Sequence, residues 1–128
     1  MSKSIVFEVA PELFKAWIWV FIGTDEKFRE WHEDKFGVDA GDCEMYGATN
    51  HVVENKKIGL RASVIWLEKF NGSPSSIGTL SHECIHASMR ILERVGVPVT
   101  LAEHEALAYL QDCILKKALK KLKKKGMM

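Results

Sequence analysis

The 128-residue chain is predicted to form an α+β domain, in which a mixed or antiparallel sheet of about four strands packs on two C-terminal helices. Three observations predict this class. Apolar runs with strand character occupy much of the first 70 residues, one helical segment interrupts them, and a helical period takes over after about residue 74. Strands and helices are thus largely segregated along the chain, whereas a doubly wound sheet would alternate them.

Length and composition are typical of one folded domain spanning residues 1–128. The chain is 47% hydrophobic and 27% charged, with nine Gly and three Pro, which excludes disordered, collagen-like and repeat proteins. The longest apolar run, residues 16–23, is too short for a membrane helix, and the N-terminus lacks a signal-peptide pattern. Three widely spaced cysteines without a CxxC pair favour reduced thiols, so we expect a cytoplasmic protein outside the membrane.

The first strands are predicted at residues 5–9 and 16–22, which are rich in β-branched and aromatic side chains. The second run is apolar on both faces, as expected of a strand in the centre of a sheet. Trp17 and Trp19 alternate with aliphatic residues in this run, and they are therefore predicted to belong to the core.

A helix and a hairpin are predicted next. Thr24 can cap the helix, which ends before Gly37, and His32 lies on its charged face and is expected to be solvated. Two strand-like runs follow at residues 44–53 and 58–70, and the alternation of apolar and other residues in the second run has the period of a strand.

Two helices are predicted in the C-terminal half. Ser73 and Pro74 form an N-cap followed by proline at the first helical position, and Gly96 ends this helix. Thr100–Glu103 has the pattern of a capping box, which predicts that a last helix begins there and continues to about Lys123.

The charge of the chain is unevenly distributed. Residues 1–115 hold eleven Lys and Arg against all seventeen Asp and Glu, whereas residues 116–128 carry seven Lys and no acid. The apolar stripe of the last helix continues through Leu119 and Leu122, and lysines near a helix C-terminus interact favourably with its dipole. We therefore interpret residues 116–128 as a solvated basic end of that helix, and nucleic-acid binding is the less favoured alternative.

The motif that predicts chemistry is His82-Glu83-Cys84-Ile85-His86, an H-E-x-x-H pattern within a predicted helix. Residues four apart lie on one helix face, so His82 and His86 can bind the same zinc ion. Glu83 is placed to act as a general base toward a metal-bound water without being a ligand. Two histidines at this spacing by coincidence are the alternative.

A catalytic zinc site needs a third protein ligand, and Glu105 is the preferred candidate. Eighteen residues separate it from His86, and it lies at the edge of the apolar face of the last helix. His104 is the second candidate, although a core role suits its position better. Glu103 is assigned to the capping box.

This pattern, with Glu105 in a His-Glu-Ala-Leu-Ala-Tyr setting, resembles the glutamate zincins, the group of thermolysin-like and zinc-aminopeptidase metallopeptidases. The block from Thr79 to about Leu115 is also similar to small zincin-like proteins of tailed bacteriophages. The resemblance implies a minimal zincin-like domain that binds zinc through His82, His86 and Glu105, located in the host cytoplasm if a phage encodes it. One departure is Tyr109, which stands where thermolysin-like proteins have Asp.

Two functions are consistent with this resemblance. The first is a zinc metallopeptidase, a hydrolase of peptide or protein substrates with Glu83 as catalytic base. Zincins commonly pair an extended substrate with the strand before the metal-binding helix, here residues 58–70. The alternative is a zinc-binding zincin-fold module that binds a protein without turnover. Candidates for stabilising an oxyanion are Tyr46, His51, Arg61 and Tyr109, each expected to be structural.

Overall fold

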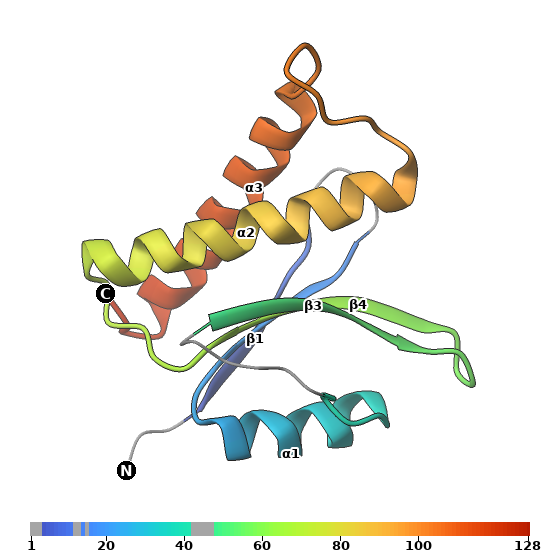
Figure 1. Cartoon of the computed structure of the whole chain (residues 1–128). Helices are drawn as coiled ribbons and strands as arrows, with labels where there is room; N and C mark the ends of the chain where they lie inside the picture. Colours follow the sequence, from blue (N-terminus) through green and yellow to red (C-terminus); the bar gives the residue numbers. More distant parts are fainter. Residues whose placement is uncertain (1–3, 12–13, 15, 42–47) are drawn as a thin grey trace.

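The computed structural model describes residues 4–11, 14, 16–41 and 48–128 and shows an α+β fold (Figure 1). The strands form one four-stranded mixed sheet in the order β1-β2-β4-β3, which confirms the predicted class. The elements in chain order are β1 (Ile5–Val9), β2 (Ile18–Ile22), α1 (Asp25–Phe36), β3 (Ala48–Asn55), β4 (Leu60–Leu67), α2 (Pro74–Val95) and α3 (Glu105–Lys124).

The sheet joins two antiparallel pairs through one parallel pair. β1 pairs with β2 and β3 with β4 in antiparallel fashion, whereas β2 and β4 are parallel, with Ile18 opposite Ser63. The prediction that β2 is a central strand is confirmed. The expectation that strand 58–70 pairs with a substrate is wrong, because β4 already has a neighbour on each side. β3 is the edge strand of this half of the described sheet.

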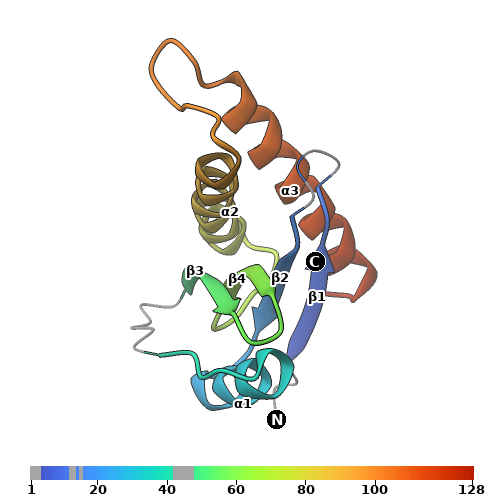
Figure 2. The same cartoon turned by 90° about the vertical axis from the view of Figure 1, so that its right-hand side faces the viewer.

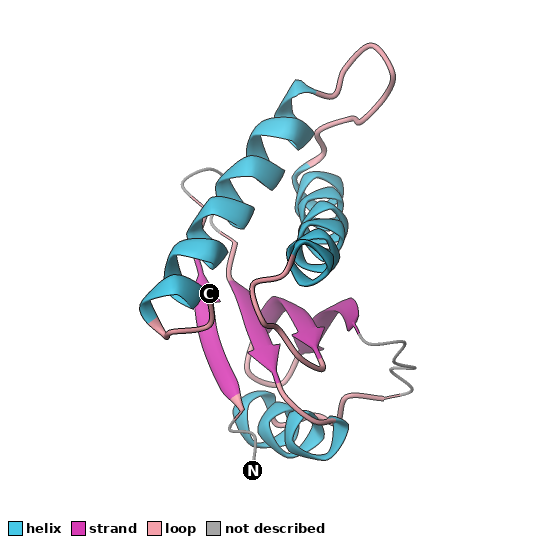
Figure 3. Ribbon diagram, turned by 90° about the vertical axis from the view of Figure 1, so that its left-hand side faces the viewer, coloured by secondary structure: helices cyan, strands magenta, loops and turns pink. Residues whose placement is uncertain are grey.

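The sheet separates two apolar cores. Figures 2 and 3 show from opposite sides how the helices are placed on its two faces. α1 covers one face, and α2 and α3 pack on the other. Alternate β4 side chains enter the two cores, with Ile65 facing α2 and α3 and Trp66 facing α1. The Trp66 ring stacks on Phe28 at a centroid distance of 4.4 Å, and its indole N–H donates to the Gly23 carbonyl at 3.0 Å.

Local capping signals set the ends of α1 and α2 where the sequence predicts them. The Thr24 hydroxyl accepts the Lys27 N–H at 3.3 Å, and the Ser73 hydroxyl accepts the Ser76 N–H at 3.2 Å. Gly37 ends α1 and Gly96 ends α2, both in the left-handed region with φ of 73° and 77°. These φ values favour glycine because other residues meet steric strain there.

The last helix begins later than predicted. The Thr100 hydroxyl does accept the Glu103 N–H at 3.0 Å, but residues 101–103 bend and α3 starts only at Glu105. The Thr100 N–H donates to the Glu103 backbone carbonyl at 2.9 Å, which closes a turn. Leu101 is 99% exposed, so no packing favours extending a helix through this segment.

Two predictions about burial in the N-terminal half are also wrong, namely that His32 is solvated and that Trp17 belongs to the core. His32 is 1% exposed, because α1 lies against the sheet and places its Nε2 atom 3.0 Å from Nε2 of His51 on β3. Trp17 is 58% exposed, because it precedes β2 and lies outside the strand register that buries Ile18.

The C-terminal part of α3 packs against the sheet through the predicted apolar stripe, in which Ala118 and Leu122 are buried. The Lys117 ammonium donates to the Ala10 carbonyl at 2.8 Å, and that of Lys121 donates to the Glu8 carbonyl. These two basic side chains therefore contact the β1 region. In the part of the chain that the structure describes, every helix is too short or too polar to cross a membrane.

Candidate metal centre

The two motif histidines lie together on α2, on the side opposite its buried residues. Both side chains are exposed, and the distance between the Nε2 atoms of His82 and His86 is 3.1 Å. Two nitrogen ligands of a tetrahedral zinc, at Zn–N distances of about 2.0–2.1 Å, are separated by about 3.3 Å. The observed spacing is close to this value, so the pair meets the geometric requirement for two ligands of one metal ion.

Glu83 occupies a different environment on the same turn. Its side chain is on the sheet-facing flank of α2, and the residue is only 7% exposed. The carboxylate makes no hydrogen bond or ion pair with the described residues. Among the described residues only Asn50 Oδ1 is a fully buried polar side-chain atom without a hydrogen-bond partner, so the Glu83 carboxylate keeps some contact with solvent.

Cys84 is a metal-ligand type of residue within the motif, but it does not belong to this centre. It points into the core, and burial raises the pKa of its thiol to about 12, with the charge of Glu83 as a second cause. Metal coordination requires the thiolate, so a thiol with this pKa remains protonated and unavailable as a ligand.

The structure does not bring the predicted third ligand to the histidine pair. Among the described residues, no group of three or more His, Cys, Asp or Glu side chains is close enough to hold a metal ion. Glu105 is the exposed first residue of α3, and His104 is its exposed N-cap. α3 contacts α2 further along its length, where Gln111 Nε2 donates to the Ser81 hydroxyl at 2.9 Å.

The oxyanion candidates are dispersed. His51 lies on the face of the sheet that packs against α1, away from α2, so it takes no part in this centre. Tyr109 is 53% exposed on α3, and Tyr46 lies outside the described residues. Arg61 lines a pocket beneath the C-terminal half of α2.

Sequence reasoning missed the two residues that share this pocket with Arg61, namely Arg90 and Arg94 of α2. The available signal was their spacing. They follow Glu83 by seven and eleven residues, so all three lie along one side of the helix.

Comparison with known proteins returns no match to a family model, to a curated protein or to a solved structure. The resemblance to glutamate zincins therefore depends on the motif and its spacing between residues 79 and 115.

Proposed function

We propose that the chain is a zinc-dependent metallopeptidase whose metal is held by His82, His86 and a third ligand from the start of α3. The observation that carries this proposal is that two Nε2 atoms lie 3.1 Å apart beside the carboxylate of Glu83, a largely buried residue whose side chain has no partner among the described residues. A structural zinc site would have no use for that carboxylate, and such sites are usually closed and rich in cysteine.

The chemistry divides between the metal and Glu83. A bound zinc ion lowers the pKa of a coordinated water toward neutrality and so supplies a nucleophile for a peptide carbonyl. Glu83 would accept the proton of that water at a carboxylate oxygen and later deliver it to the leaving amine. Its position supports this role, because Glu83 directly follows His82 on the same turn of α2.

Glu105 is the preferred third ligand in this proposal, and His104 is the second candidate. Either residue would have to approach the histidine pair from its present exposed position at the N-terminus of α3. The required movement involves residues 96–104 and the first turn of α3, because Leu110 and Ile114 are buried in the core beyond it. Nearly all side chains of residues 98–105 are exposed, so few packing contacts oppose such a movement.

A zinc-binding module without turnover is the second candidate function. The observation that favours it is that two ligands, rather than three, converge in the structure. Under this function the edge strand β3 would serve protein binding by strand addition, and Glu83 would have no catalytic role.

The decisive experiment is metal analysis of the purified chain, followed by titration of the chelator-treated protein with zinc. We expect about one zinc per chain, and we expect His82→Ala and His86→Ala each to abolish binding, since each removes one of three ligands. His104→Ala and the parent serve as folded references by circular dichroism. Absence of zinc, together with no uptake on titration, would overturn the proposal.

A further inference from the structure

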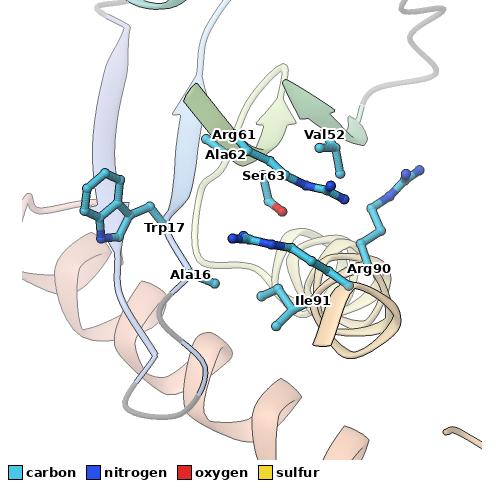
Figure 4. Close-up of a pocket in the computed structure, with 9 residues that line it drawn as sticks. Ala16, Trp17, Val52, Arg61, Ala62, Ser63, Arg90 and Ile91 are labelled. Atoms are coloured by element: carbon cyan, nitrogen blue, oxygen red, sulfur yellow. The ribbon is translucent and has the colours of Figure 1, made fainter. Parts of the chain in front are cut away.

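Three arginines line a pocket that the proposed catalytic residues do not use. Arg61 of β4 and Arg90 of α2 are labelled in Figure 4, and Arg94 follows Arg90 on α2. The pocket is a small hollow of about 20 Å³ between α2 and the sheet face beneath it. Its other lining residues are Ala16, Trp17, Val52, Ala62, Ser63 and Ile91.

Within the described part of the chain, none of these positive charges has an anionic partner. The three guanidinium groups form no hydrogen bond or ion pair with the described residues, although residues 1–115 carry an excess of acidic side chains. Like charges gathered at one place repel each other, so the arrangement is stabilised when an anion binds between them. Arginine suits a carboxylate in particular, because its planar group can donate two parallel hydrogen bonds.

A second polar group in the pocket also lacks a partner. Ser63 is 8% exposed, and its hydroxyl forms no hydrogen bond with the described residues. Figure 4 shows Ser63 and Arg61 among the side chains that line the pocket. The hydroxyl keeps some contact with solvent, and it could donate a hydrogen bond to an anion held by the arginines.

The pocket and Glu83 lie along the same side of α2. Arg90 and Arg94 lie within about 20° of the direction of Glu83 around the axis of α2, and they lie about 10 and 16 Å further along that axis. An extended peptide advances about 3.3 Å per residue, so three to five residues would bridge the distance.

The edge strand β3 lies beside the line from Glu83 to the arginine pocket. β3 and α2 run in the same general direction (Figure 1), and Val52 of β3 lines the arginine pocket. Two residues earlier, on the same face of β3, Asn50 donates from Nδ2 to the Val64 carbonyl at 3.2 Å. Its Oδ1 atom is buried and has no hydrogen-bond partner among the described residues.

We infer that the pocket formed by Arg61, Arg90 and Arg94 binds a carboxylate of a peptide substrate, three to five residues from the bond that Glu83 acts on. The carboxylate belongs either to the free C-terminus of the peptide or to an Asp or Glu side chain. The position of the bond rests on the proposed function, whereas the carboxylate site itself does not.

The test measures peptide binding to the full chain carrying Glu83→Gln, which prevents turnover. Fluorescent peptide libraries are compared as free acids and as C-terminal amides, each with Asp and Glu either present or replaced by Asn and Gln. Charge-assisted hydrogen bonds to arginine predict at least about tenfold tighter binding for peptides that carry the carboxylate. Arg94→Gln should remove this preference and Arg94→Lys should restore it in part, whereas Lys123→Gln, an equal loss of charge on α3, should not change it.

The outcomes separate the two proposals. A preference for free acids assigns the C-terminal carboxylate, and a preference for Asp or Glu in either series assigns the side chain. Equal binding of all four peptide sets overturns the inference, and so does saturation of the pocket by inorganic phosphate with no peptide preference. A carboxylate preference that depends on Arg94 in a protein that binds no zinc would retain the pocket and reject the metallopeptidase.

Discussion

A pair of histidines on the opposite side of the sheet, His32 buried and His51 half-buried, makes the stability of the fold sensitive to acid. Nε2 of His32 lies 3.0 Å from Nε2 of His51, and Nδ1 of His32 lies 2.9 Å from the Val38 carbonyl oxygen. Burial lowers the pKa of both imidazoles. For His51 the value falls from 6.5 to about 4, mainly through loss of solvation, with smaller contributions from His32 and from Arg90. For His32 the Val38 hydrogen bond and Asp39 oppose the effect of burial, and Arg29 adds to it.

Whether acid stabilises or destabilises the fold depends on whether the folded or the unfolded chain binds the proton at higher pH. With a pKa of 6.5 when unfolded and about 4 when folded, His51 takes up its proton in the unfolded chain at higher pH. Its contribution to stability is therefore complete above about pH 6.5 and is lost as the pH falls toward 4. The full shift corresponds to a loss of about 1.8 kcal/mol between about pH 7 and pH 5. Because His51 is only partly buried, we expect about 1 kcal/mol from it, with a further loss of the same sign from His32.

Urea unfolding of the parent at about pH 7 and about pH 5, with a chelator present to exclude metal binding, measures this loss. His51→Gln should reduce the pH dependence, whatever its effect on stability at neutral pH, because it removes a titrating group whose pKa is lowered in the folded state. His104→Gln, at an exposed position, is the matched control. An unchanged pH dependence in His51→Gln would refute the assignment of the acid sensitivity to this pair.

The remaining predictions concern the candidate metal centre. In calorimetric titrations, Glu105→Gln should weaken zinc binding sharply, whereas His104→Ala should still bind about one zinc per chain. The reverse result would make His104 the third ligand. Glu83→Gln should retain fold and zinc but lose about 10²- to 10⁴-fold in peptide cleavage, because an amide cannot accept the proton. Equal cleavage by the parent and Glu83→Gln would exclude this residue as the base, and a zinc-loaded parent that cleaves no peptide library or lysate would support the binding module.

Much of the secondary structure could be predicted from sequence, because its determinants are local. Thr24 with Gly37 and Ser73 with Gly96 specify helix ends through hydrogen bonds and backbone preferences of nearby residues. The start of α3 shows the limit of this reasoning. Thr100 forms the predicted hydrogen bond, yet the helix does not begin there, because a cap satisfies backbone groups without supplying the packing that extends a helix.

The features that could not be predicted depend on contacts between distant segments. The charged neighbours of His32 suggest exposure, but its burial is decided by His51, nineteen residues away on another element. The arginine pocket likewise joins Arg61 to a helix some thirty residues further along the chain. Within the candidate site, the histidine pair was predictable from helix periodicity, whereas the position of Glu105 depends on a connection whose path has no periodic signal.

The parallel pairing of β2 with β4 has a consequence for the order of folding. The β1–β2 and β3–β4 ladders join segments close in sequence and can form early, but pairing Ile18 with Ser63 requires closure of a loop that contains α1 and β3. α2 follows β4 after a short connection and packs over β3 and β4. The helix that carries His82 and His86 can therefore pack on the β3–β4 hairpin before β2 joins β4, so its position does not depend on the slow non-local step.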